Sequence, residues 1–550
     1  SMIRTTPDEI LTGGTVLTMD SKTPFATAIA LAGGRILAVG TDAEIKALAG
    51  AGTKHTQLHG RHIMPGLIES HTHALWGACR DLFDVYTGYS ASLTELLQAT
   101  GKRAANLPAG STVHGGPWRH EMRSEMGQCP RILLDEISRE HPIVLFDTSQ
   151  HVAWANTFAI KQAGLGGIPD DIKGGVIERS EDGSASGIFA ESAIEGLKAL
   201  TVHTEAQMAE AAREFTRYFN GLGFTAFKEP MAFEPELRAY HAADQRGEMT
   251  LHAAAHIVKA GVSAERVSYD ELERLRKSYR SENLRTDFAK LFVDGVAPSF
   301  TASFSEPYLA SAGYDVAGHM PDATLLISPE EHAEMMIELD RRGFTVKMHA
   351  VGDNAISKGL DAIAAARRTN GMSGLRHEIA HASFIADADV ARFKALDAIA
   401  ELSPKLWAPN AATPSQIKVL GAQRLEKIYR LKDLHAAKAE MTYASDWPAS
   451  APDANPWTGL AGMLTRRDVT GQFAGTVAPS QAISLAEALP LFTTNGARSL
   501  KMETETGSLT AGKWADFITL PKPLSEMAPE EIGACTPLQT RWKGRVVYEG

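Results

Sequence analysis

The chain has 550 residues, of which 44% are hydrophobic and 22% charged, and its formal net charge is −11 at pH 7. This length exceeds one ordinary hydrophobic core, so we expect two or three domains in a globular protein. Acidic and basic residues are interspersed, which argues against nucleic acid or an anionic membrane surface as a partner. The three cysteines, Cys79, Cys129 and Cys535, lack metal-binding or redox spacing, and so few thiols suit a reducing compartment.

Neither a leader nor a membrane span is evident. The first ten residues, SMIRTTPDEI, lack a charged segment followed by an apolar one, so they do not resemble a signal peptide. No window approaches about 18 consecutive apolar residues. We therefore expect a cytoplasmic protein whose partner is a small-molecule substrate.

Both ends of the chain have the pattern of short strands. Residues 9–62 show period-two alternation with Gly-Gly turns, and residues 505–550 repeat this texture. The pattern predicts that residues 1–62 and 505–550 form one small β-sandwich.

The middle of the chain alternates short apolar runs with helical patterns, which is typical of a parallel sheet with crossover helices. Eight segments are candidate strands: 64–73, 223–229, 250–257, 289–295, 345–350, 377–382, 398–404 and 441–446. They predict an α/β fold with a TIM-type (β/α)8 barrel over residues 63–455, followed by closing helices over 456–504. An open doubly wound sheet is the alternative, but its Gly-rich sequence is missing after the first strand. Before one helical pattern, Ser328 is expected to be the N-cap, with Glu331 completing a capping box.

A long segment separates the first two candidate strands. It has roughly 145 residues, far more than a normal βα loop. Residues 76–222 contain a candidate strand at 141–147 and helical patterns, so we expect an inserted subdomain. At the C-terminal face of the barrel it would cover the active site and shape substrate choice.

Metal-ligand residue types gather at the ends of the candidate strands. His71 and His73 are two apart, so on a strand both imidazoles point to the same face. His349, His381 and Asp446 end three further strands. Singly, each fits a hydrogen-bonded histidine or a turn-capping aspartate. Together, at the same end of one barrel, they predict a zinc-class metal site.

These residues lie in stretches that resemble the amidohydrolase superfamily, specifically amidohydrolase family 3. The stretches are MPGLIESHTH, DTSQHVAWANTFAI, KLFVDG, HAVGDNA, RHEIAHA, ASDWP and GSLTAGKWADF. They follow in family order over nearly the whole chain. The resemblance implies the barrel, the sandwich formed from both termini and the insertion after strand one. Because most barrels of this superfamily associate, it also fits a homodimer, although no sequence feature decides the oligomeric state.

The resemblance assigns roles to individual residues. His71 and His73 correspond to the metal ligands of strand one, and His349 and His381 to those of strands five and six. Asp446 corresponds to the strand-eight aspartate that touches the metal and handles the proton. The implied cofactor is zinc or another divalent metal, as one or two ions.

Lys290 decides between one ion and two. It falls where many superfamily members carry a carboxylated lysine that bridges two metals, and a carbamate on Lys290 is therefore expected. The other interpretation is an ordinary lysine paired with Asp294, and Lys228 and Glu229 are rival bridging candidates. Without the carbamate, the site holds one metal.

This sequence departs from the family pattern in three places. Glu69 stands where aspartate is more common before the two histidines, and Ala380 stands where an acid often precedes the strand-six histidine, with Glu378 displaced by two. The end of strand seven, SPKLWAPN, also differs. These changes bear on substrate choice rather than on the metal core.

The ligand set predicts metal-assisted hydrolysis at a carbonyl-type carbon, and the resemblance implies a C–N bond of the amide, N-formyl or carbamate-like type, other than a peptide bond. Asp446 is the expected general base. His381, or His151 of the insertion, is expected to steady the developing oxyanion, and Trp118 to line the substrate pocket with His151.

Two other functions remain open. One is a metal-dependent deaminase of a cyclic amidine or nucleobase, which in this superfamily usually has one metal and no strand-four lysine. The other is a non-catalytic binding or regulatory protein on a degenerate barrel, which predicts lost ligands. Serine-nucleophile and phosphate-binding motifs are missing from the sequence.

Overall fold

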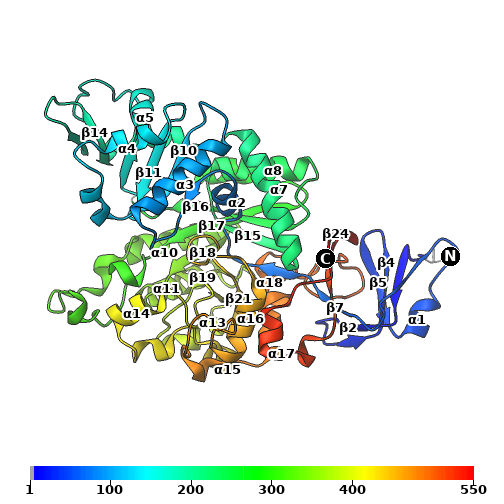
Figure 1. The fold of residues 1–550 in the computed structure, drawn as a ribbon. Coiled ribbons are helices and arrows are strands. Elements are labelled where there is room, and N and C mark those ends of the chain that lie inside the picture. Colours follow the sequence, from blue (N-terminus) through cyan, green and yellow to red (C-terminus); the bar gives the residue numbers. More distant parts are fainter. Residues whose placement is uncertain (1–4, 264) are drawn as a thin grey trace. The chain divides into compact units, whose positions relative to one another are not determined.

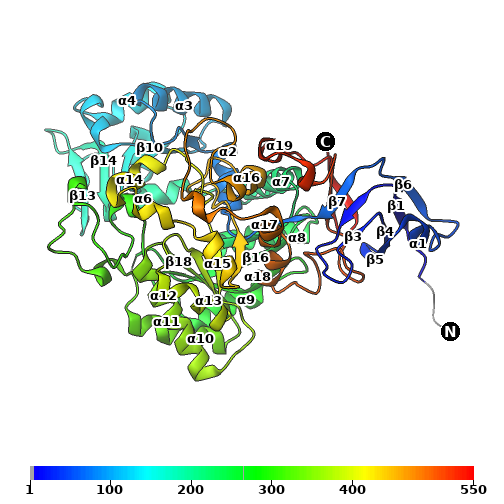
Figure 2. The same cartoon turned by 90° about the horizontal axis from the view of Figure 1, so that it is seen from below.

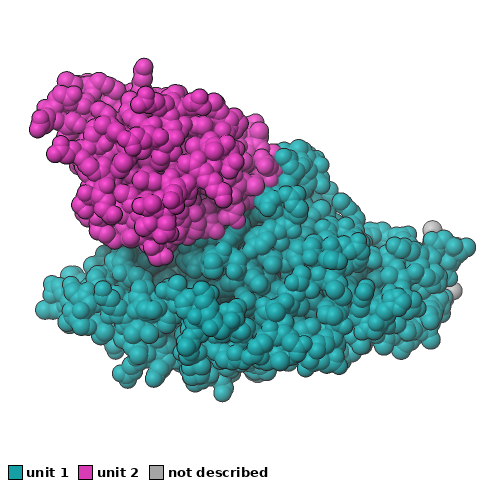
Figure 3. Space-filling view, viewed as in Figure 1, with its two compact units in different colours: residues 1–74, 212–550 teal, residues 75–211 magenta. Residues whose placement is uncertain are grey.

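The computed structural model describes residues 5–263 and 265–550. The chain divides into two compact units (Figure 3): residues 1–74 with 212–550, and residues 75–211.

The first unit contains a sheet of eight parallel strands in the order β21-β20-β19-β18-β17-β16-β15-β8. The strands are β8 (Leu67–Glu69), β15 (Phe224–Ala232), β16 (His252–Ala260), β17 (Leu284–Phe292), β18 (Thr345–Ala350), β19 (Glu378–His381), β20 (Ile399–Leu402) and β21 (Glu440–Tyr443). Each of the eight predicted segments overlaps one of them, although the bounds of several differ by a few residues. The backbone N–H of Ser70 donates to the carbonyl of Tyr443 at 3.1 Å and brings the first and last strands together. The predicted TIM-type barrel is therefore confirmed.

Helices follow the strands and gather around the outside of the barrel (Figures 1 and 2). They are α7 (Glu205–Leu222), α8 (Glu234–Gln245), α9 (Tyr269–Tyr279), α10 (Pro329–Arg341), α11 (Asp353–Asn370), α12 (Asp387–Val390), α13 (Arg392–Ala395), α14 (Thr413–Leu420), α15 (Leu431–Ala436), α16 (Pro456–Thr465), α17 (Leu485–Phe492) and α18 (Thr494–Ser499). Ser328 caps α10 as expected, by accepting the N–H of Glu331. The Glu331 carboxylate, however, binds the Arg266 guanidinium.

The segment expected to be strand one is two strands. β7 (His62–Pro65) pairs with C-terminal strand β22 (Phe517–Leu520), whereas β8 pairs with β15 of the barrel. Gly66 separates them, and a Cβ atom at this position would lie 2.3 Å from the Thr225 side chain. The chain can pass from one sheet to the other because no side chain intervenes.

Both ends of the chain build a β-sandwich, as predicted. One sheet comprises β1 (Glu9–Thr12), β4 (Ala28–Ala32), β5 (Arg35–Gly40) and β6 (Lys54–Gln57). The other comprises β2 (Thr15–Leu17), β3 (Phe25–Ala26), β7, β22, β23 (Gln539–Trp542) and β24 (Arg545–Glu549). Apolar side chains from both chain ends, such as Leu11, Ile29 and Phe517, share one core. The blue and red segments accordingly lie together in Figure 1. Short helices α1 (Asp42–Lys46) and α19 (Pro529–Gly533) complete these ends.

The second unit is an α/β layer structure around a six-stranded mixed sheet, ordered β13-β14-β12-β11-β10-β9. The strands are β9 (Val85–Tyr86), β10 (Val113–Trp118), β11 (Ile143–Asp147), β12 (Val152–Ala155), β13 (Gly175–Arg179) and β14 (Ala185–Glu191). The helices are α2 (Ala74–Leu82), α3 (Leu93–Asn106), α4 (Pro130–Ile137), α5 (Thr157–Gln162) and α6 (Glu195–Lys198). α3 and α4 contribute to one apolar cluster, and α5 and α6 to another, so the sheet buries two faces.

No helix in the described part of the chain combines the length and apolar character that crossing a membrane requires.

Candidate metal centre

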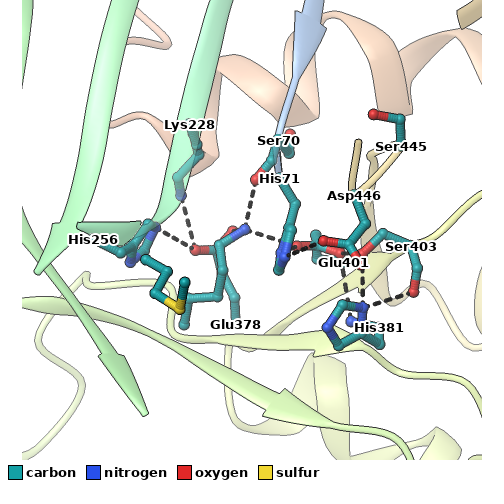
Figure 4. Close-up of polar contacts among 12 residues, drawn as sticks. Ser70, His71, Lys228, His256, Glu378, His381, Glu401, Ser403, Ser445 and Asp446 are labelled. Atoms are coloured by element: carbon teal, nitrogen blue, oxygen red, sulfur yellow. Dashed lines mark hydrogen bonds and ion pairs between the residues drawn. The ribbon is translucent and has the colours of Figure 1, made fainter. Parts of the chain in front are cut away.

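Four of the predicted ligands meet at the C-terminal end of the barrel. His71 and His73 lie directly after β8 rather than within it, His381 ends β19, and Asp446 follows β21. Nε2 of His71 lies 3.1 Å from Oδ1 of Asp446, and Nε2 of His73 lies 3.2 Å from the same oxygen. Ligand atoms of His71, His381 and Asp446 all lie within 4.8 Å of one another. Figure 4 shows these three side chains converging.

Backbone hydrogen bonds hold the two halves of this cluster together. The Asp446 N–H donates to the His71 carbonyl, and the His73 N–H donates to the Trp447 carbonyl, both at 2.9 Å. Glu69 adds a side-chain link, because its carboxylate accepts the N–H groups of Ser445 and His71. Burial raises the pKa of Glu69 to about 8.

His349, on β18, adjoins this cluster through its contact with His381. Its ring centroid lies 4.5 Å from that of His381. Its Nε2 is 2.9 Å from the carbonyl oxygen of Gly295. The ring of His349 therefore packs against that of His381, while its Nε2 contacts the Gly295 carbonyl.

The backbone at the cluster is strained. His381, Ala382 and Asp446 have φ values of 72°, 50° and 59°, in the left-handed region that favours glycine. Each such residue costs on the order of 1–3 kcal/mol, and such residues concentrate at functional sites. Here the strained positions carry two of the convergent side chains.

Burial keeps most of these imidazoles neutral. It lowers the pKa of His71, His349 and His381 below the usual range, so each retains a lone pair for a metal. His73 differs, since the Asp446 and Glu229 carboxylates outweigh burial and raise its pKa to about 9. Although burial opposes it, the surrounding histidines, His71 first, hold the pKa of Asp446 well below its usual range.

Lys290 lies in the barrel interior on β17, with 1% of its surface exposed. Burial, reinforced by the Lys347 ammonium, lowers its pKa to about 7. Among residues 5–263 and 265–550, its Nζ forms no hydrogen bond or ion pair. Asp294 instead accepts backbone N–H groups of Ser303, Val351 and Gly352, so it does not pair with Lys290.

The rival bridging residues are engaged elsewhere. Lys228 donates to Glu378 at 2.8 Å and to the Ser499 carbonyl at 2.7 Å. Glu229 accepts the Tyr240 hydroxyl, and its other oxygen lies 3.6 Å from Nδ1 of His73. Lys228 is thus part of an interior ion pair, whereas Glu229 borders the histidine cluster.

The sequence interpretation missed Glu401, on β20. Its Oε1 lies 2.5 Å from Nδ1 of His71 and 2.8 Å from Nζ of Lys347, and its Oε2 accepts the Ser403 hydroxyl (Figure 4). The available signal was a carboxylate inside the apolar run AIAELSP, where an unpaired charge would be costly.

The two residues expected to contact substrate lie in the second unit. Trp118 is 2% exposed, packs edge-on against Trp154 and donates its indole N–H to the Leu145 carbonyl, which places it in that unit's core. The His151 side chain is 63% exposed and pairs with Glu191.

The donor set fits a zinc-class ion. Three buried imidazoles and a carboxylate are the ligand types that such metals take. Two ring nitrogens face a single carboxylate oxygen, Asp446 Oδ1, which has no hydrogen-bond partner of acceptable geometry among the described residues. A bound divalent cation would satisfy this buried oxygen.

The chain is similar to known proteins along most of its length. A family model described as the amidohydrolase family matches residues 56–548. The chain belongs to the amidohydrolase family. This amidohydrolase is 27% identical to the N-substituted formamide deformylase of Arthrobacter pascens, over 98% of both chains. It is 29% identical to Protein LONG AFTER FAR-RED 3 of Arabidopsis thaliana, over 93% of this chain and 87% of that protein.

The fold of this amidohydrolase is also shared by solved structures. An uncharacterized metal-dependent hydrolase from Pyrococcus horikoshii OT3 superimposes with a TM-score of 0.74 and 22% identity, covering 95% of this chain and 99% of the other. At that identity the likeness concerns the fold alone.

Proposed function

We propose that this amidohydrolase cleaves the C–N bond of a small, non-peptide amide, with an N-substituted formamide as the first substrate class to test. The observation that carries the proposal is the convergence of His71, His73 and His381 on the carboxylate of Asp446. A degenerate barrel would have lost part of this set. The similarity to a formamide deformylase along the full length supports the choice of substrate class.

His71, His73, His349 and His381 would hold the metal, with Asp446 as a further ligand. When bound, a divalent ion lowers the pKa of water and polarises the substrate carbonyl. Asp446 is the carboxylate on which the histidines converge, and as an ionised group at neutral pH it can accept a proton. We assign it the proton of the attacking water.

The proton balance then needs no further acid. Water oxygen bonds to the carbonyl carbon, the C–N bond breaks, and the proton taken up by Asp446 is delivered to the leaving nitrogen. The products are a carboxylic acid and an amine. His381 remains a candidate for steadying the oxyanion, whereas Trp118 lies in the core of the second unit and is assigned no role in the reaction.

A carbamate on Lys290 would allow a second ion. The neutral amine adds carbon dioxide and releases one proton, and burial supplies a large neutral fraction near pH 7. The isolation of its Nζ from ion-pair partners among the described residues supports this assignment. We propose zinc as the metal. We also propose that the protein is cytoplasmic, that its partner is a small molecule rather than nucleic acid or a membrane, and that it forms a homodimer.

The test is product release by metal-loaded enzyme from a panel of N-substituted formamides, simple amides and carbamates, with a cyclic amidine as the deaminase substrate. We expect formate and amine from the formamides, and loss of about 10²–10⁴-fold in kcat for Asp446→Asn. Asp361→Asn, which removes a surface carboxylate paired with Arg392, is the control and should keep full activity. Retention of activity within about tenfold by Asp446→Asn contradicts the assigned base. If the enzyme releases ammonia from the amidine and no product from the other substrates, its reaction is deamination rather than amide hydrolysis.

A further inference from the structure

A second group of metal-ligand side chains lies in the unit of residues 75–211, apart from the barrel cluster in sequence and in composition. It comprises Asp84, His114 and His203, whose side chains are 12%, 12% and 19% exposed. One ligand atom from each residue lies within 4.8 Å of the others. We propose that these three residues bind a zinc-class divalent cation that stabilises this unit.

The geometry lets two imidazoles and one carboxylate share a cation, although the contact between His203 and Asp84 is a hydrogen bond when no ion is bound. Nε2 of His203 lies 2.8 Å, and Nε2 of His114 3.4 Å, from the same oxygen, Oδ1 of Asp84. The two imidazole rings are 5.0 Å apart. Zinc–nitrogen and zinc–oxygen bonds of about 2.0–2.2 Å place neighbouring ligand atoms of a tetrahedron about 3.3 Å apart, close to these separations. Two imidazole nitrogens and one carboxylate leave a coordination position for water.

Three different parts of the fold hold the ligands in place. Asp84 lies just before β9, and the parallel pairing of Val85 with Gly115 sets it beside His114 at the start of β10. The Arg103 guanidinium donates to the carbonyls of Asp81, Leu82 and Asp84, which fixes the loop that carries the carboxylate.

His203 is fixed by the start of the following helix. Directly after it, Thr204 and Gln207 exchange hydrogen bonds between side chain and backbone in both directions. This reciprocal cap determines where the chain turns into α7 and so restricts the position of the imidazole.

The position in the chain indicates what the ion would do. Asp84 and His203 are 119 residues apart and lie near residues 75 and 211, where this unit begins and ends. A metal that joins them closes a loop containing most of the unit, which lowers the entropy of its unfolded state. The inferred role is structural, and it does not depend on the reaction in the barrel.

Metal content per chain tests the proposal. The variants are Asp84→Asn/His203→Gln and, as a matched control, Asp171→Asn/His120→Gln, which replaces an exposed aspartate and an exposed histidine of the same unit. After reconstitution with zinc and removal of loose ions, the first variant should contain about one equivalent less than the wild type, with the control unchanged. Equal zinc content in the first variant and the wild type overturns the proposal.

A second measurement uses the unaltered chain, so it does not depend on the folding of a variant. Histidine carbethoxylation by diethyl pyrocarbonate is followed by peptide mass spectrometry, with and without zinc. Zinc should protect His114 and His203 at least fivefold, whereas the exposed His120 should react equally in both samples. Equal labelling of His114 and His203 with and without zinc overturns the site even if total zinc is high.

Discussion

Nδ1 of His71 lies 2.5 Å from Oε1 of Glu401, a residue 330 positions further along the chain. A carboxylate at Nδ1 fixes that nitrogen as the donor and turns the lone pair of Nε2 toward Asp446. The same carboxylate also binds Lys347 and the Ser403 hydroxyl. Glu401 is therefore a positioning residue that acts on the candidate centre through His71.

Replacing Glu401 should weaken metal binding without removing a ligand. For Glu401→Gln we expect metal affinity to fall about 10–100-fold, because the His71 ring loses its anionic partner. Competition with a chromophoric chelator measures this. Glu271→Gln, a surface change on α9, is the control. An unchanged affinity in Glu401→Gln means that Glu401 serves only the interior ion pairs.

Lys290 should carry the carbamate if two ions are present. Purified protein reconstituted with excess zinc and ¹³C-bicarbonate should show a carbamate carbon signal and close to two ions per chain. Lys290→Arg should lose the signal, since a guanidinium does not react with carbon dioxide. Removing carbon dioxide from the wild type should likewise reduce metal content. A full metal complement under those conditions, or a signal that persists in Lys290→Arg, excludes carboxylation at this lysine.

A side chain at Gly66 should destabilise the first unit. The Cβ of Gly66→Ala would lie 2.3 Å from Thr225, so either β8 or β15 must move. Overpacking of this kind costs about 1–3 kcal/mol in the free energy of unfolding. Gly52→Ala is the matched control, because no atom lies within 4 Å of its added Cβ. Urea unfolding of both variants gives the comparison, and equal midpoints would show that the junction tolerates a methyl group.

His332 should make stability depend on pH. Burial in α10 lowers its pKa from 6.5 to about 4, so the unfolded chain binds a proton more readily than the folded one. This stability is present above pH 6.5 and is lost as pH falls toward 4, by about 3 kcal/mol in all. His332→Met, which keeps a side chain of similar volume, should show a smaller fall in unfolding temperature between pH 7 and pH 4. Identical falls in both proteins would contradict the assignment.

The sequence by itself was sufficient for the eight barrel strands, for the sandwich shared by both chain ends, and for the order of His71, His349, His381 and Asp446. Side-chain alternation is a local property of each segment, and residues at the carboxyl ends of parallel strands must meet at one end of a barrel. These inferences do not require knowledge of the register between neighbouring strands.

Only the tertiary structure revealed the partners of these residues. Glu401 reaches His71, Lys228 pairs with Glu378, and Lys290 lies without an ion-pair partner among the described residues. The division of the first strand at Gly66 and the burial of Trp118 in the second unit were likewise not evident from the sequence pattern. Each depends on strand register and on contacts between residues far apart in the chain. Burial also sets the local dielectric, and it is burial that moves the pKa of Lys290 to about 7.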